Sequence, residues 1–242
     1  MDRQRRVPRA IREREMLEVA TRVFAERGYH RASMDEIAEG AGISKPMLYA
    51  YFESKDGLFL ACMRRARVAL FEAITGGADA GAAPDEQLWF GVLGFFSFVE
   101  EERDTWDVLL GDAGSGAEQF AAERAKVRRD VGRLVGTLLR QAAADEGADP
   151  EELEATEPLA RALIGGGESL AAWWRDHPGV TREGMARLLM NFAWMGFGDL
   201  VRGERWQGVR PAPSPARRRP RPAAGRSSGT RPRARRSTHR LS

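Results

Sequence analysis

Between residues 33 and 55 the chain concentrates side chains that donate hydrogen bonds or present small apolar groups. Serine and tyrosine hydroxyls and lysine ammonium groups donate to phosphate oxygens, and lysine also reaches the edges of bases. Small apolar side chains suit the methyl group of thymine. Six residues of this kind form the candidate contact set for a nucleic acid: Lys45, Pro46, Met47, Tyr49, Ala50 and Tyr51.

The rest of the chain offers no arrangement of side chains for catalysis. The three histidines, His30, His177 and His239, are far apart, and none belongs to a Ser/His/Asp or Cys/His pattern. Cys62 is the only cysteine, which excludes an intramolecular disulfide and a multi-cysteine metal site. The sequence has neither a phosphate-binding glycine loop nor a dinucleotide fingerprint. We therefore expect no enzymatic activity, no cofactor and no metal site.

Two short helices joined by a three-residue turn are expected to position the contact set. Ser33 and Glu36 form a capping box, which predicts the start of a helix that ends near Gly40. The turn follows at residues 41–43, and a second helix runs from about residue 44 to residue 52. This spacing predicts a helix-turn-helix.

The second short helix separates its side chains into two faces, because successive residues are 100° apart. Leu48 and Phe52 point one way, where Ile37 of the first helix is available to pack against them. The opposite face holds the outward members of the contact set, namely Pro46, Met47 and Ala50, flanked by Lys45, Tyr49 and Tyr51. An apolar outer face suits the major groove of DNA better than it suits water.

A specific motif runs through this segment: Leu48-Tyr49-Ala50-Tyr51-Phe52 and then Ser54-Lys55, with Ala41-Gly42-Ile43-Ser44 ahead of them. Together with Phe24, Gly28 and Leu58, the motif resembles the DNA-binding domain of the TetR family of bacterial transcriptional regulators over residues 11–60. The resemblance implies that the contact set binds a double-stranded DNA operator. It also adds Ser33, Ser44 and Lys55 to that set, because they stand at positions of the family's motif. It also implies a C-terminal helical domain that forms a homodimer and binds a small-molecule effector, which releases the DNA. Repression is the default that the family implies.

The remainder of the chain up to residue 207 has the pattern of long helices without strands, so the expected fold class is all-α. Further helices are expected at about 12–27, 54–74, 86–102, 104–110, 117–145, 151–176 and 182–203. The helix at 86–102 is apolar all round, which predicts burial on nearly every side. Gly91 and Gly94 leave room beside it, so the candidate lining of a hydrophobic ligand pocket is Trp89, Phe96, Trp106 and Phe120. A plain apolar core is the alternative.

The last two helices carry the candidate dimer interface. The glycines at residues 165–167 each cost about 1 kcal/mol relative to alanine inside a helix, which indicates close approach by another helix. Two helices from each subunit would form a four-helix interface. The interface candidates are Leu163, Gly166, Leu170, Met190, Trp194 and Phe197. Packing within one chain is the alternative explanation of the glycines.

The formal net charge of +3 hides an uneven distribution of charge along the chain. Residues 1–66 carry 13 Lys and Arg against 10 Asp and Glu, residues 67–207 carry 14 against 25, and residues 208–242 carry 11 Arg and no acid. The last segment is also rich in proline and poor in apolar residues, which predicts disorder. The expected domains are a flexible basic arm at 1–10, a helix-turn-helix domain at 11–56, a ligand-binding and dimerisation domain at 57–207, and a disordered basic tail at 208–242.

Basic ends on an acidic body predict contact with a polyanion at those ends. Two functions fit this pattern: a sequence-specific regulator, and a nonspecific nucleic-acid-binding or architectural protein that uses the tail. A specific regulator keeps a large preference for its own site at moderate salt, which separates the two. No apolar run approaches the ~18 residues of a membrane span, and the N-terminus lacks the apolar core of a secretory signal. We therefore expect no membrane partner and a cytoplasmic location.

Overall fold

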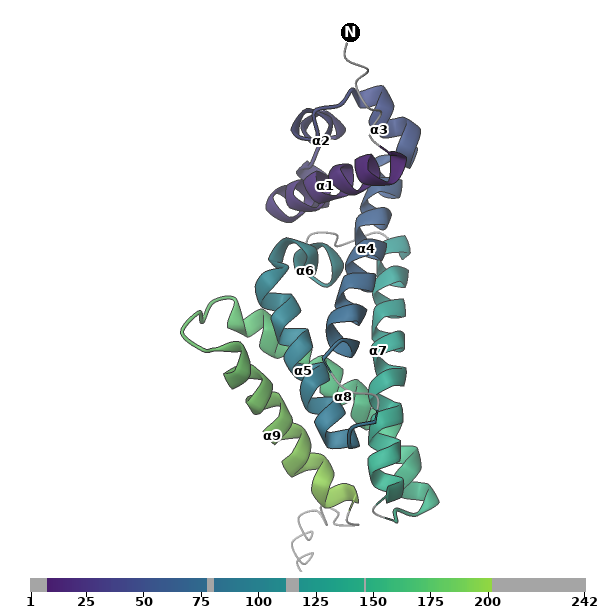
Figure 1. The fold of residues 1–242 in the computed structure, drawn as a ribbon, viewed down its shortest axis with the longest axis vertical. Helices are drawn as coiled ribbons and strands as arrows, with labels where there is room; N and C mark the ends of the chain where they lie inside the picture. The colour runs from purple at the N-terminus through teal and green to yellow at the C-terminus, as the bar shows by residue number, and fades with distance from the viewer. Residues whose placement is uncertain (1–7, 78–80, 112–117, 146, 202–242) are drawn as a thin grey trace, which may run out of the picture. The chain divides into compact units, whose positions relative to one another are not determined.

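The computed structural model describes residues 8–77, 81–111, 118–145 and 147–201, and all regular structure in these ranges is helical (Figure 1). In chain order the helices are α1 (Arg9–Arg31), α2 (Met34–Gly40), α3 (Lys45–Phe52), α4 (Lys55–Thr75), α5 (Pro84–Glu101), α6 (Arg103–Leu109), α7 (Glu118–Asp145), α8 (Pro150–Trp174) and α9 (Arg182–Val201). The all-α fold class is thereby confirmed. Most of the predicted basic arm and the whole predicted tail lie outside the described residues.

Local sequence signals set several of the helix ends. The Ser54 hydroxyl caps α4 by accepting a hydrogen bond from the backbone N–H of Gly57 at 2.9 Å. The predicted stop at Gly28 is instead a kink near the end of α1. Gly28 has a φ of 72°, which a glycine adopts without a steric penalty, and helical structure continues to Arg31.

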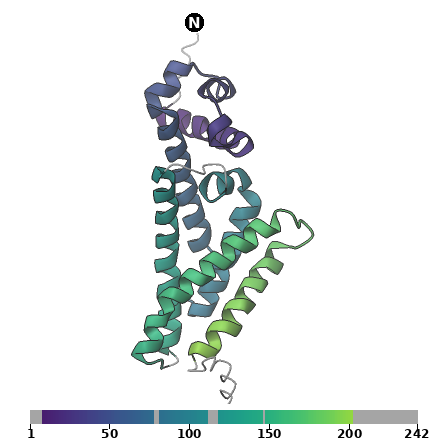
Figure 2. The same ribbon diagram turned by 180° about the vertical axis from the view of Figure 1, so that it is seen from behind.

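The first three helices and the start of α4 share one apolar core. Phe24 of α1 is fully buried, and its ring centroid lies 4.9 Å from that of Phe59 in α4. Ile37 of α2 and Leu48 of α3 are buried in the same cluster. Helix α4 then runs on from these helices into the rest of the bundle (Figures 1 and 2). The domain boundary expected between residues 56 and 57 therefore falls in the first turn of a continuous helix.

Helix α5 lies inside the remaining bundle and contacts α4, α7 and α9. Its approach to α4 is close at Gly94, where an added Cβ would lie only 2.8 Å from the carbonyl carbon of Ala73 and would collide with the carbonyl oxygen. Only glycine allows that distance between the two backbones. The contacts on several sides agree with the all-round apolar character of the sequence of α5.

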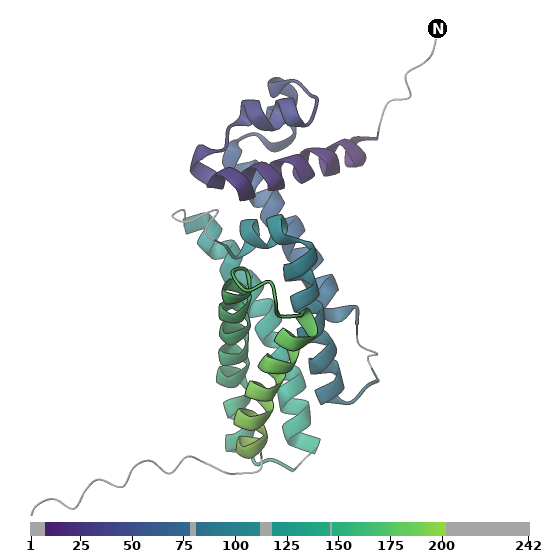
Figure 3. The same cartoon turned by 90° about the vertical axis from the view of Figure 1, so that its left-hand side faces the viewer.

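Helices α8 and α9 form a hairpin along one side of the bundle (Figures 2 and 3). The indole N–H of Trp174 donates to the carbonyl oxygen of Val180 at 2.7 Å and holds the connection between the two helices. Helix α8 packs on α7, and α9 packs on α5. None of the described helices combines the length and the apolar character that crossing a membrane requires.

Candidate nucleic-acid interface and ligand cavity

A tight turn joins α2 to α3 and sets the angle between them. Gly42 has a φ of 64°, a conformation that side chains with a Cβ rarely adopt. The N–H of Gly42 donates to the carbonyl of Glu39, and the N–H of Ile43 donates to that of Ala38, both at 3.0 Å. These bonds and the buried side chains of α2 and α3 hold the two helices as a helix-turn-helix.

The two faces of α3 are divided largely as the spacing predicts. Leu48 and Phe52 are buried, whereas Tyr49 is 39% exposed. Lys45, Pro46 and Ala50 are also exposed, so they line the solvent side of the helix. Met47 differs from the prediction, because it is half-buried and packs against the core. The outer surface of α3 is therefore narrower than expected and mixes hydroxyl, ammonium and small apolar groups.

Lys45 is held at the surface by a carboxylate of the preceding helix. Its ammonium Nζ lies 2.9 Å from Oδ2 of Asp35. The hydrogen bond that Lys45 donates to Asp35, together with the negative charge of that carboxylate, raises the pKa of Lys45. Exposed ion pairs of this kind contribute little to stability, because water and salt screen them. Lys45 can consequently exchange Asp35 for a phosphate oxygen or a base edge at little cost.

The two serines that precede the short helices differ in their contacts. Ser33 caps α2, since its hydroxyl accepts from the N–H of Glu36 at 3.0 Å. The other half of the expected capping box is replaced, because the Glu36 carboxylate accepts from Nε of Arg27 at 3.2 Å. Ser44 occupies the N-cap position of α3 without a capping hydrogen bond from its side chain. Its exposed hydroxyl therefore remains available to another partner.

Lys55 and Tyr51 are engaged by α1. The Lys55 ammonium donates to the carbonyl oxygen of His30 at 3.2 Å and lies 4.7 Å from the ring centroid of Tyr29. The guanidinium of Arg9 lies 5.0 Å from the ring centroid of Tyr51. Both members of the contact set thus also connect helices within the domain.

A polar and aromatic cluster joins α7 to the helix-turn-helix domain. The Tyr29 hydroxyl donates to Oδ1 of Asp56, and the side-chain amide of Gln119 donates to Oδ2 at 2.7 Å. The ring of Phe120 packs edge-on against Tyr29 at 4.9 Å and against Phe59 at 4.6 Å. Sequence reasoning missed this contact, because the two hydrogen bonds join residues 27 and 63 positions apart and no local pattern connects them.

An apolar cavity of about 70 Å³ lies among α4, α5, α7, α8 and α9. Its walls combine aliphatic and aromatic groups with one ion pair: Leu70, Ile74, Gly91, Val92, Phe95, Leu110, Val127, Arg128, Val131, Leu163, Ile164, Gly167, Glu168 and Leu189. Arg128 and Glu168 form a two-pronged salt bridge across α7 and α8, with Nε and Nη2 of the arginine each 2.9 Å from a carboxylate oxygen. The cavity is thus an apolar space with one pair of opposite charges on its wall.

The four expected pocket residues do not line this cavity. Phe96 packs on Phe95 and Trp174, Phe120 belongs to the contact with the helix-turn-helix domain, and Trp89 is half-buried against the core. Trp106 lines a different, polar hollow. Trp89 and Phe96 lie on the same side of α5. This side is roughly a quarter turn around the helix axis from the residues of α5 that line the cavity. Helix α5 thus contributes to the cavity wall through residues other than Trp89 and Phe96.

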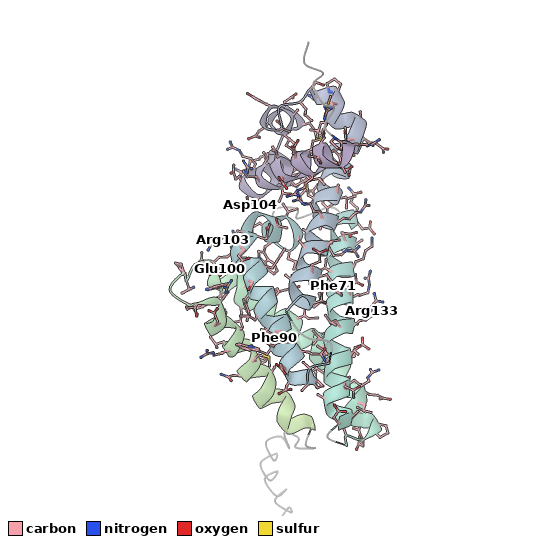
Figure 4. The ribbon with its side chains drawn as sticks, viewed as in Figure 1. Phe71, Phe90, Glu100, Arg103, Asp104 and Arg133 are labelled. Atoms are coloured by element: carbon pink, nitrogen blue, oxygen red, sulfur yellow. The ribbon has the colours of Figure 1, made fainter. Side chains whose placement is uncertain are left out.

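Further hollows open at the surface of the described residues, among them a polar one and a shallow groove. The polar one, of about 230 Å³, includes Glu100 and Arg103 at the junction of α5 and α6 (Figure 4). A shallow groove of about 740 Å³ lies between α4 and α7, with Phe71 and Arg133 on its two sides (Figure 4). Among the described residues no cluster of His, Cys, Asp and Glu is suited to hold a metal ion.

Comparison with known proteins identifies both parts of the chain. Residues 16–62 match the family described as "Bacterial regulatory proteins, tetR family", and residues 84–196 match "Tetracyclin repressor-like, C-terminal domain". The HTH-type transcriptional activator FasR of Mycolicibacterium smegmatis is 30% identical over 79% of this chain and 85% of FasR. The chain belongs to the TetR family. It is therefore a DNA-binding transcriptional regulator with a helix-turn-helix, and not an enzyme.

Other TetR-family proteins agree with this assignment. The crystal structure of a TetR-like transcriptional regulator from Rhodococcus sp. RHA1 is 38% identical and has a TM-score of 0.66, covering 80% of this chain and 99% of its own. The HTH-type transcriptional repressor KstR2 of Mycobacterium tuberculosis is 35% identical over 48% of this chain and 60% of KstR2. An activator and a repressor thus both resemble this TetR-family chain.

The residues exposed on the α8–α9 hairpin differ from those expected at the dimer interface. Leu163 is buried in the cavity wall, and a Cβ on Gly166 would face Leu189 of α9 at 3.6 Å. For these two residues the structure corrects the expectation, since packing within the chain occupies them. Leu170 and Met190 are half-buried against the core, and the side chains of Trp194 and Phe197 lie outside the described part of the chain.

Large apolar side chains that the prediction missed are exposed on α8 and α9 instead. Trp173 is 45% exposed, Leu188 is 53% exposed and Phe192 is 62% exposed. Leu188 and Phe192 are one helical turn apart on α9, so they share a face. The sequence alone does not show which side of α8 and α9 faces the bundle. Their exposed apolar residues therefore could not be distinguished from their buried ones.

Proposed function

We propose that this TetR-family regulator binds a palindromic DNA operator as a homodimer, represses transcription there, and is released by a small hydrophobic effector. The observation that carries the proposal is the outer face of α3, where Lys45, Tyr49 and Ala50 are exposed beside the capping residue Ser44. Such a face combines donors for phosphates and bases with a small apolar contact for thymine. We further propose that the protein acts in the cytoplasm.

The dimer part of the proposal rests on two arguments. A single eight-residue recognition helix contacts few base pairs, so two copies are needed for a useful preference. Two-fold symmetry of the protein then requires an inverted repeat in the DNA. The exposed side chains of Trp173, Leu188 and Phe192 supply apolar area for the interface.

Release by an effector requires that the ligand favour a geometry that misplaces the recognition helices, because equal affinity for both geometries shifts nothing. The apolar cavity supports this part of the proposal, since Val127 and Val131 of α7 line it. The N-terminal end of the same helix holds Gln119 and Phe120 against the helix-turn-helix domain. Movement of α7 on ligand binding would therefore reach the DNA-binding helices.

The test is genome-wide footprinting of the DNA that the full-length protein protects, followed by transcript measurement in a strain that lacks it. We expect a small number of protected inverted repeats and higher transcription of the genes beside them in the deletion strain. Lower transcription there would indicate an activator, as FasR is named. Uniform, salt-sensitive protection without a repeat would instead support the nonspecific alternative that uses the basic tail.

The tail itself is tested by a chain that ends at Gly208. Its 11 arginines without balancing acid should add affinity for any DNA sequence. We expect the truncated chain to show a shallower dependence of affinity on salt and an unchanged or higher preference for the operator. An unchanged salt dependence would mean that the tail pairs with the acidic body.

A further inference from the structure

Helix α3 has a single charged residue, and a carboxylate of α2 neutralises it. Between Lys45 and Phe52 only Lys45 carries a charge, and its Nζ lies 2.9 Å from Oδ2 of Asp35. Asp35 belongs to the first turn of α2, so this ion pair joins the two helices of the helix-turn-helix. The pair as a whole therefore presents no net charge to a phosphate backbone.

Helix α2 adds negative charge beside the outer face of α3. Its seven residues include Asp35, Glu36 and Glu39 and no basic residue. Glu36 pairs at 3.2 Å with Arg27 of α1, which lies outside the contact set. Asp35 differs from Glu36, because its partner belongs to the contact set. Replacing Asp35 by a neutral residue therefore changes the charge that α3 offers to DNA.

Both side chains of the pair are open to solvent, so DNA can reach them. The Asp35 side chain is 71% exposed, and that of Lys45 is 46% exposed. A phosphate that approaches the Lys45 ammonium also approaches the Asp35 carboxylate, and like charges repel. A base edge instead offers Lys45 hydrogen bonds of fixed direction, which can replace the bond to Asp35. The pair thus responds differently to the two parts of DNA.

We propose that Asp35 is a specificity-determining residue, which acts through Lys45 by restraining its contact with phosphates while leaving its contact with base edges. The inference rests on the proposed function, because it concerns how the operator is distinguished from other DNA. An interface gains specificity when it penalises wrong partners as well as rewarding the right one. Nonspecific binding depends on phosphate contacts, so a restraint on those contacts weakens it selectively.

The salt dependence of binding gives the restraint a magnitude. Each neutralised phosphate steepens the slope of log affinity against log salt by about 0.9. Asp35→Asn frees Lys45 for one additional phosphate, so on random DNA the slope should steepen by about 0.9 for one protomer and about 1.8 for a dimer. Between about 50 and about 200 mM salt, the advantage of the variant on random DNA should then shrink roughly tenfold.

The experiment measures the affinity of the full-length protein for the footprinted operator and for random duplex of equal length across that salt range, by fluorescence anisotropy. We expect Asp35→Asn to bind random DNA more tightly and to lose roughly threefold or more of its preference for the operator. Asp35→Glu keeps the charge and should keep the preference. Glu18→Gln is the matched control, because it removes a carboxylate from an exposed ion pair with Arg65 of α4. This control should change neither the slope nor the preference.

A double-mutant cycle with Lys45→Met separates action through Lys45 from a direct contact of Asp35 with DNA. If Asp35 acts through Lys45, adding Asp35→Asn to the Lys45→Met protein should leave the operator preference unchanged. An equal loss of preference in that background would overturn the inference and assign Asp35 a contact of its own. An unchanged slope in Asp35→Asn, or the same change in Glu18→Gln, would overturn it as well.

Two further measures keep the test decisive. Asp35→Ser is the second neutral variant, used if the asparagine variant does not fold. If the unchanged protein prefers no site over random DNA, the proposed operator binding fails. The slopes on random DNA still decide in that case whether Asp35 restrains Lys45, so the two failures are distinguishable.

Discussion

Replacing Tyr29 by phenylalanine tests the contact between α7 and the helix-turn-helix domain. The change deletes the hydroxyl that donates to Asp56 and keeps the ring, whose centroid lies 5.2 Å from that of Phe59 and 4.9 Å from that of Phe120. Gln119 continues to donate to the second oxygen of Asp56. The variant therefore isolates one hydrogen bond to a carboxylate from the aromatic packing around it.

The expected loss of stability follows from the type of bond. A hydrogen bond to a charged group contributes about 1.5–3 kcal/mol, and the half-buried position of Tyr29 favours the lower half of that range. For a chain of this length 1 kcal/mol corresponds to a change in Tm of roughly 2–4 °C. We expect Tyr29→Phe to lower the Tm by about 3–8 °C at pH 7. Tyr49→Phe, at an exposed position, is the control and should leave the Tm unchanged.

The pH dependence gives a second and independent measurement. Hydrogen bonds from Tyr29 and then Gln119 lower the pKa of Asp56, so its contribution to stability is present above its ordinary value and is lost as the pH falls through the lowered value. Burial, and then the bond to Asp56, raises the pKa of Tyr29 to about 12. Its contribution is full below about pH 10 and is lost as the pH rises toward 12.

Thermal unfolding of the unchanged protein and of Tyr29→Phe between pH 3 and pH 11 therefore has a defined outcome. The difference in Tm should be largest between about pH 5 and pH 9 and should shrink at both ends. A difference equal to that of the Tyr49 control, or one that is independent of pH, would refute the reasoning. Since Gln119 and Val127 belong to the same helix, the variant should also reduce the factor by which an effector weakens operator binding.

Four further substitutions address the DNA interface, the dimer and the bundle. Lys45→Ala should cost about 1–3 kcal/mol of discrimination at one base position in each half-site, measured by competition between operator variants. Lys55→Ala should weaken operator and random DNA equally, and it should also lower the Tm because the bond to the end of α1 is lost. Phe192→Glu should shift the dimer toward monomer in sedimentation at micromolar concentration, whereas Arg187→Glu on the same helix should not. Gly94→Ala should lower the Tm by forcing α5 away from the backbone of α4.

The helix-turn-helix could be predicted closely because its determinants are local. The cap at Ser33 and the turn at Gly42 act within four residues, and the spacing of Leu48 and Phe52 defines the inner face without knowledge of the partner helix. Met47 departs from the prediction because its burial depends on what packs beside α3. Long apolar helices were likewise predictable, with ends within a few residues of those observed.

The ligand site could not be predicted to the same depth, because it depends on how helices are rotated about their axes. Phe95 and Phe96 are neighbours in an apolar run and are indistinguishable by composition, yet only Phe95 faces the cavity. The close backbone contact at Gly94 determines which side of α5 faces α4, and thereby the direction of Phe95 and Phe96. The charged wall depends on partners 40 residues apart, Arg128 and Glu168, for which no spacing rule exists.

The three adjacent glycines of α8 show how one sequence feature can serve two purposes. A Cβ on Gly167 would lie 3.3 Å from Leu189 and 3.6 Å from Phe95, and Gly166 faces Leu189 as well, so these two permit close packing within the chain. An added Cβ at Gly165 would meet open space, with nothing within 4 Å. Packing within the chain, the alternative explanation, therefore accounts for two of the glycines. If the homodimer forms on this hairpin, Gly165 is the position at which a helix of the partner subunit can approach the backbone of α8.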